Sequence, residues 1–102
     1  MHFLVTITPS PEAADALDAA PGGPGALFGW IAERYHPVAF WVSAGERSAS
    51  WIIDVDGAGQ LHELVHIAAR KAATAPVLIP IVLGDEAAAT IPAAMQVAAL
   101  AP

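Results

Sequence analysis

The most recognisable chemical pattern in the chain is H-E-x-x-H, spelled by residues 62–66 as HELVH. On a helix, His62 and His66 lie one turn apart on one face and can bind zinc, while Glu63 can serve as general base toward a zinc-bound water. A catalytic zinc site needs a third protein ligand, and Glu86 is the only glutamate that follows. We therefore keep His62 and His66 only as a weak metal candidate. We expect a solvated helix face there, with no metal and no other cofactor.

A histidine and an aspartate form a second candidate pair. His2 and Asp54 fall on predicted strands that would be antiparallel neighbours. They meet if the start of one strand lies opposite the end of the other, and Thr6 then lies near Ser50. Asp54 would orient His2 as a catalytic general base. The alternative is an ordinary cross-strand pair beside a dimer interface.

Three further residues are candidates for ligand contacts. Tyr35 and His36 lie where a predicted helix gives way to a strand, a position that can face the mouth of a cavity. Trp41 can stack on a planar ligand or, alternatively, fill the core of a dimer. Together with Thr6 and Ser50, these residues form the predicted ligand-binding set.

Four short runs of apolar, β-branched and aromatic residues predict strands. They are His2–Thr8, Val38–Ala44, Ser48–Val55 and Val77–Leu83. Pro80 cannot donate a ladder hydrogen bond, so the last strand is expected at an edge or at a bulge.

Helical spacing and capping residues predict the remaining elements. Ser10 caps a helix that Pro21–Gly25 interrupts and that resumes over residues 26–35. Asp56 is expected to cap a further helix over residues 58–74. With right-handed crossovers, this β-α-β-β-α-β order predicts an α+β, ferredoxin-like fold, in which two helices cover one face of a four-stranded antiparallel sheet.

Apolar side chains occur on both faces of this predicted sheet. Alternation assigns the more apolar set to the helix-covered face: Phe3, Val5, Ile7, Val38, Phe40, Val42, Trp51, Ile53 and Val55, with Trp30 as a further core residue. The uncovered face is expected to carry Leu4, Trp41, Ile52, Leu78 and Val82 beside small polar groups. Because helices cover only one face, we expect a second copy of the chain to cover the other and form a homodimer.

Composition narrows the class of protein. A chain of 102 residues with 56% hydrophobic residues builds one small core, which we place in residues 1–86, with residues 87–102 as a helical extension. A net charge of −6 disfavours nucleic acids and anionic membranes as partners. The uncharged run Ala87–Pro102 is shorter than the ~20 residues of a membrane helix. With no cysteine and no signal-peptide pattern, we expect a cytoplasmic protein.

Four segments carry a family resemblance: HFLVTIT at residues 2–8, HPVAFW at 36–41, SWIIDVD at 50–56 and VLIPIV at 77–82. Together they resemble a family of small uncharacterised bacterial proteins that is similar to the dimeric α+β barrel superfamily. The resemblance covers residues 1–86 and implies two ferredoxin-like sheets packed face to face around a shared cavity. The break at Pro21–Gly25 departs from the family pattern, which has a more continuous helix.

That superfamily includes muconolactone isomerase-like enzymes, cofactor-free monooxygenases and haem-degrading enzymes, and none of their catalytic residues maps onto this chain. The resemblance therefore implies a homodimer that binds a small, partly apolar ligand, with cofactor-free isomerase or monooxygenase chemistry as its possible activity. The alternatives are a non-catalytic dimeric accessory protein and a zinc-dependent hydrolase that uses the HELVH segment.

Overall fold

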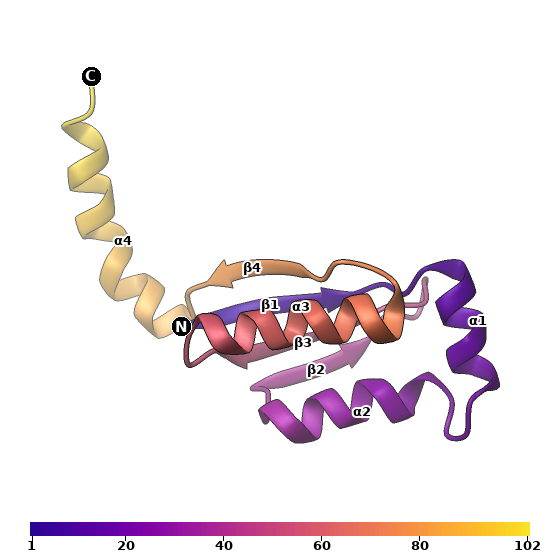
Figure 1. The fold of residues 1–102 in the computed structure, drawn as a ribbon. Coiled ribbons are helices and arrows are strands. Elements are labelled where there is room, and N and C mark those ends of the chain that lie inside the picture. The colour runs from indigo at the N-terminus through magenta and orange to yellow at the C-terminus, as the bar shows by residue number, and fades with distance from the viewer.

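A computed structural model describes residues 1–102 and shows an α+β fold in which four antiparallel strands form one open sheet. The strands are β1 (His2–Ile7), β2 (Ala39–Val42), β3 (Ala49–Asp54) and β4 (Val77–Ile81), arranged in the order β2-β3-β1-β4 (Figure 1). The four helices are α1 (Pro11–Ala19), α2 (Pro24–Tyr35), α3 (Ala58–Ala72) and α4 (Gly84–Ala99).

The predicted strands and the predicted helix break are confirmed. The Ser10 side chain accepts a hydrogen bond from the Ala13 amide at 3.1 Å and so caps α1. Gly22 and Gly23 have φ values of +81° and +62°, which glycine adopts without steric cost, and the chain turns there into α2. Strand β4, which contains Pro80, lies at an edge of the sheet, where a missing ladder donor does least harm.

One face of the sheet packs under α2 and α3, which lie on the same side of it (Figure 1). Trp51 is fully buried at its centre. The ring of Phe28 meets Trp51 edge-on at 5.8 Å, and the ring of Phe40 stacks on it at 5.5 Å. The largest fully buried side chains of this core are Val5, Ile7, Ile31, Trp51, Ile53 and Leu64. For β1 and β3, the side chains predicted to face the helices do so.

The prediction was wrong for β4. Leu78 pairs with Val5 and packs against the core, so Val77 and Ile79 occupy the open face instead, and Val82 lies beyond the end of the strand. Nearly every residue of this strand is apolar, so its sequence contains no alternation that distinguishes one face from the other.

Four expected core positions are also solvent-exposed. Trp30 on α2 is 49% exposed and does not belong to the buried core cluster. On the edge of the sheet, Val38 just before β2 and Phe40 and Val42 within it are exposed, although the ring of Phe40 stacks on Trp51.

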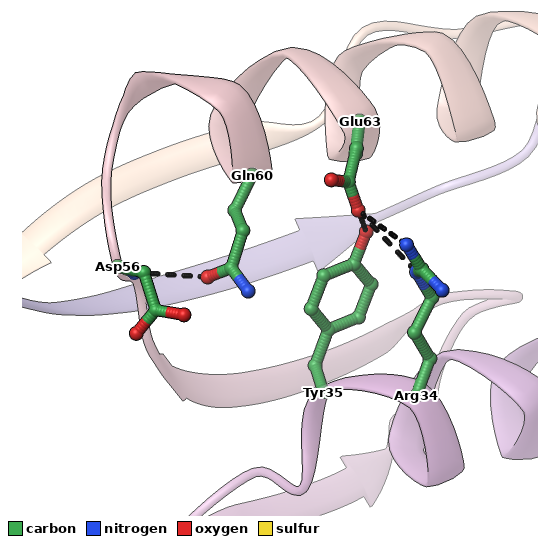
Figure 2. A network of polar contacts seen from close by, with 5 residues as sticks. All are labelled: Arg34, Tyr35, Asp56, Gln60 and Glu63. Atoms are coloured by element: carbon green, nitrogen blue, oxygen red, sulfur yellow. Dashed lines mark hydrogen bonds and ion pairs between the residues drawn. The ribbon is translucent and has the colours of Figure 1, made fainter.

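The ends of α3 differ from the prediction. Gly57, not Asp56, is its N-cap, and the Asp56 amide instead donates a hydrogen bond to Oε1 of Gln60 at 2.9 Å (Figure 2). At the other end the helix stops at Ala72, and Ala73 closes it in a left-handed conformation with φ of 50°. Alanine is disfavoured in that region because its Cβ approaches the carbonyl oxygen.

Helix α4 begins at Gly84, slightly before the helical extension predicted for residues 87–102, and it continues through Pro92. Asp85 and Glu86 in its first turn and the alanines that follow favour a helix there, so the loss of one backbone donor is tolerated. No residue of α4 is buried, and the helix runs away from the sheet (Figure 1). None of the helices is both long and apolar enough to span a membrane.

The left-handed position of Ala73 generates a stability prediction. Replacing Ala73 with glycine should raise the free energy of unfolding by about 1 kcal/mol, because glycine adopts this conformation without the Cβ clash. The matched change Ala69→Gly, at an exposed interior position of the same helix, should lower it by about 1 kcal/mol. Urea titration followed by circular dichroism measures both, and equal destabilisation by the two changes would contradict the prediction.

Candidate functional site

The open face of the sheet carries its side chains in rows that run across the strands. The pairing register places Trp41, Ser50, Thr6 and Val77 in one such row, one residue from each strand. The next row contains Ala39, Ile52, Leu4 and Ile79. The first row thus has two hydroxyl groups flanked by apolar side chains, and the second row is entirely apolar.

The two hydroxyl groups are bonded to each other. Thr6 Oγ1 and Ser50 Oγ are 2.8 Å apart, and Ser50 is buried while Thr6 is half-buried. In such a pair one hydroxyl donates to the other, which leaves one hydroxyl hydrogen and several lone pairs free to bond a ligand. The sequence predicted that Thr6 and Ser50 would be neighbours, and the register confirms it.

Trp41 lies beside this hydroxyl pair, because it is the register partner of Ser50 on the edge strand β2. Its side chain is 45% exposed. An indole next to hydroxyl groups offers a flat apolar surface together with hydrogen-bonding groups, a combination typical of sites for small planar molecules. The structure therefore brings together Trp41, Thr6 and Ser50 of the predicted ligand-binding set.

His2 and Asp54 are also register partners, at the end of the sheet. The Asp54 carboxylate accepts a hydrogen bond from the amino group of Met1 at 3.1 Å, and no hydrogen bond joins it to His2. Both partners of this ion pair are well exposed to solvent, so it contributes little stability. His2 and Asp54 are adjacent as predicted, and a role as general base for His2 stays a prediction.

Tyr35 and His36 are not part of this face. Tyr35 is buried on the helix side of the sheet, and His36 is an exposed residue that ends α2 with φ of 46°. The hydroxyl of Tyr35 donates a hydrogen bond to Oε1 of Glu63 at 2.8 Å. Tyr35 therefore joins α2 to α3 and lies apart from Trp41.

Glu63, the glutamate of the HELVH segment, accepts hydrogen bonds from two α2 residues (Figure 2). Besides Tyr35, Arg34 donates to Glu63 Oε1 from Nη2 at 3.0 Å and from Nε at 3.3 Å. No group of three potential metal-ligating side chains forms around His62 and His66 or elsewhere. The Glu63 carboxylate, which would act as the general base of a zinc site, thus joins α3 to α2 instead.

We call Arg34, Tyr35 and Glu63 the interhelical clamp. No pattern in the sequence predicts this clamp, since Arg34 and Tyr35 are 29 and 28 residues from Glu63 and each resembles an ordinary surface or core residue. The hydrogen bond from Tyr35, followed by those from Arg34, lowers the pKa of Glu63. Burial, followed by the bond to Glu63, raises the pKa of Tyr35.

No protein-family model matches the chain, and no curated protein matches it either. The candidate site is therefore defined by its geometry: Trp41, Ser50 and Thr6 on the open face, with His2 and Asp54 at its end.

The clamp predicts a pH dependence of stability. Because the folded-state pKa of Glu63 lies below its ordinary value of 4.5, its stabilising effect is complete above pH 4.5 and is lost as the pH falls through the lower, folded-state value. Wild type should therefore be more stable than Glu63→Gln at pH 7, and the difference should shrink below pH 4.5. Urea unfolding across the acid range measures this difference.

Glu33→Gln provides the control, because Glu33 is an exposed carboxylate on α2 outside the clamp. It should follow the wild-type acid profile. A Glu63→Gln profile that runs parallel to wild type at every pH would show that the clamp does not act through the charge of Glu63.

Proposed function

We propose that this chain forms a homodimer by packing the open faces of two sheets together, and that the dimer binds a small, partly apolar ligand between them. The observation that carries the proposal is an uncovered sheet face rich in apolar side chains, with one hydroxyl pair near its middle. The antiparallel order β2-β3-β1-β4 is the order that a ferredoxin-like arrangement requires, and this supports the proposed architecture.

The case for a second copy rests on exposure. Trp41, Ile79 and Val77 are between 45% and 53% exposed, and they belong to the two edge strands that border the half-buried Leu4 and Ile52. A contiguous apolar patch of this kind is unusual on a monomeric protein and is typical of an interaction surface. Two sheets packed face to face would cover both patches at once, since a two-fold interface uses the same surface on each partner.

The chemistry of the first row favours a ligand as well as a dimer contact. Apolar sheets can pack together without hydroxyl groups, whereas Thr6 and Ser50 provide a hydrogen-bonding pair beside the flat surface of Trp41. A planar apolar molecule with one hydroxyl or carbonyl group would satisfy both features. We therefore take this as the class of ligand.

Binding, not catalysis, is the activity that we propose. The resemblance of the sequence to dimeric α+β barrel proteins implies cofactor-free isomerase or monooxygenase chemistry, for which His2 with Asp54 would be the general base. In the structure Asp54 bonds to the amino group of Met1 instead. A tightly filled interface without a ligand would make the chain a non-catalytic accessory protein.

The dimer is tested at Trp41. Sedimentation equilibrium of the wild type should give twice the chain mass of 10.5 kDa. Trp41→Glu places a charge in the proposed interface and should raise the dimer dissociation constant by about 30-fold or more, since central interface residues contribute ~2 kcal/mol or more. Val65→Glu, an exposed apolar position on α3, is the matched control and should leave the mass unchanged. A monomeric wild type would overturn the dimer.

Ligand binding is tested with 4-ethylphenol, a planar apolar molecule with one hydroxyl. In proton–nitrogen NMR spectra it should shift the indole N–H signal of Trp41. Replacing Thr6 with valine and Ser50 with alanine should weaken its binding by about 2- to 12-fold for each hydrogen bond lost, or 0.5–1.5 kcal/mol. Thr8→Val, at an exposed residue just after β1, is the matched control and should leave the affinity for 4-ethylphenol unchanged. Unchanged affinity in the double variant would exclude the hydroxyl pair from the site.

A further inference from the structure

A separate pocket of about 470 Å³ lies on the helix side of the sheet, where α1, α2 and α3 meet. Figure 1 shows α2 and α3 on one side of the sheet, with α1 at one end of them. Its volume falls in the range of about 300–1,000 Å³ that is usual for small-molecule sites. It is lined by Leu17 of α1, by Ala26, Leu27 and Trp30 of α2, and by His66, Ile67, Arg70 and Lys71 of α3.

The walls of the pocket are mostly apolar, because α1, α2 and α3 each contribute apolar side chains to it. Leu27 and Trp30 of α2, Ile67 of α3 and Leu17 of α1 all contribute to the lining. Leu27 and Ile67 also pack against the core, which makes this wall part of the rigid fold. The exposure of Trp30 is explained by its position, because its side chain borders this open pocket.

The distribution of positive charge is the second observation. The chain has only four basic residues against ten acidic ones. Arg34 pairs with Glu63, and Arg47 pairs with Asp15 and Asp18. Arg70 and Lys71 have no carboxylate within ion-pair distance, and both line this pocket. In a protein of net charge −6, the unpaired arginine and lysine thus converge on one apolar cavity.

From this combination we infer that the pocket binds an amphipathic carboxylate, a small molecule with an apolar chain or ring and one carboxylate group. The apolar part would contact Leu17, Leu27 and Trp30, and the carboxylate would bond to Arg70 and Lys71. Arg70 and Lys71 also interact favourably with the dipole of α3, because they lie in its last turn. That interaction would stabilise the helix equally well without a neighbouring cavity. The inference does not depend on the proposed dimer, because the pocket lies on the opposite side of the sheet.

The three tryptophans allow the two sites to be distinguished. Trp30 borders this pocket, Trp41 lies on the open sheet face, and Trp51 is buried in the core. Titration of the full chain with octanoate should shift the indole N–H signal of Trp30 while leaving that of Trp41 in place. Octan-1-ol, which has the same chain without the charge, should bind at least about tenfold more weakly, since charge-assisted hydrogen bonds are the stronger ones.

Charge variants complete the test. Arg70→Gln combined with Lys71→Gln should weaken octanoate binding at least about tenfold. Ala93→Glu combined with Gln96→Glu makes the same change in net charge at exposed positions of α4, which does not line the pocket, and should change the affinity less than about twofold, as expected for distant exposed charges. Circular dichroism checks that each variant is folded. Trp30→Ala removes an apolar wall of the pocket at a half-exposed residue, so it should weaken octanoate binding without unfolding the chain.

Three outcomes would overturn the inference. A shift of the Trp41 signal without a shift of the Trp30 signal would place octanoate on the open sheet face. Equal weakening of binding by both charge variants would indicate general attraction of an anion. Movement of the Trp30 signal with protein concentration, in the absence of octanoate, would indicate that a second copy of the chain occupies the pocket.

Discussion

The antiparallel pairing of β1 with β3 is the interaction on which the rest of the structure depends. Val5 opposite Trp51 and Ile7 opposite Ala49 form the buried centre of the core, and their burial excludes any other register. A shift by one residue would move this apolar set to the open face and bring Thr6 and Ser50 under the helices. The register that forms the core therefore also places the hydroxyl pair on the opposite face.

Scarcity of positive charge shapes the helix side of the molecule. Arg34 belongs to the clamp between α2 and α3, while Arg47 bridges from the β2–β3 loop to two carboxylates of α1. A single exposed ion pair contributes little energy. Even so, Arg34 and Arg47, two of the four basic residues of the chain, both form contacts that join helices to other elements. The remaining two basic residues, Arg70 and Lys71, lie in the last turn of α3 and border an apolar cavity.

The HELVH segment illustrates how far a short motif depends on its surroundings. Helix α3 gives His62 and His66 the one-turn spacing that zinc binding needs. In the tertiary structure, however, the carboxylate of Glu63 bonds to a buried tyrosine and an arginine from another helix. Glu63 thus acts in folding, through contacts that the five-letter pattern does not describe.

The sequence by itself determined the four strands, the α1–α2 break, the edge position of β4 and the faces of β1 and β3. These properties follow from local causes: proline and glycine angles, capping hydroxyls and alternation of apolar residues along a strand. Because the faces of β1 and β3 were predictable, so was the neighbourhood of Thr6 with Ser50 and of His2 with Asp54.

Only the tertiary structure decided which side chains of β4 face the core, that Trp30 borders a pocket, and that Glu63 bonds to Tyr35. An almost continuously apolar strand has no alternation, so its face depends on pairing with β1. The clamp and the pocket depend on how far apart two helices lie at each point along their length. That distance results from packing residues that are distant in sequence, and no local pattern records it.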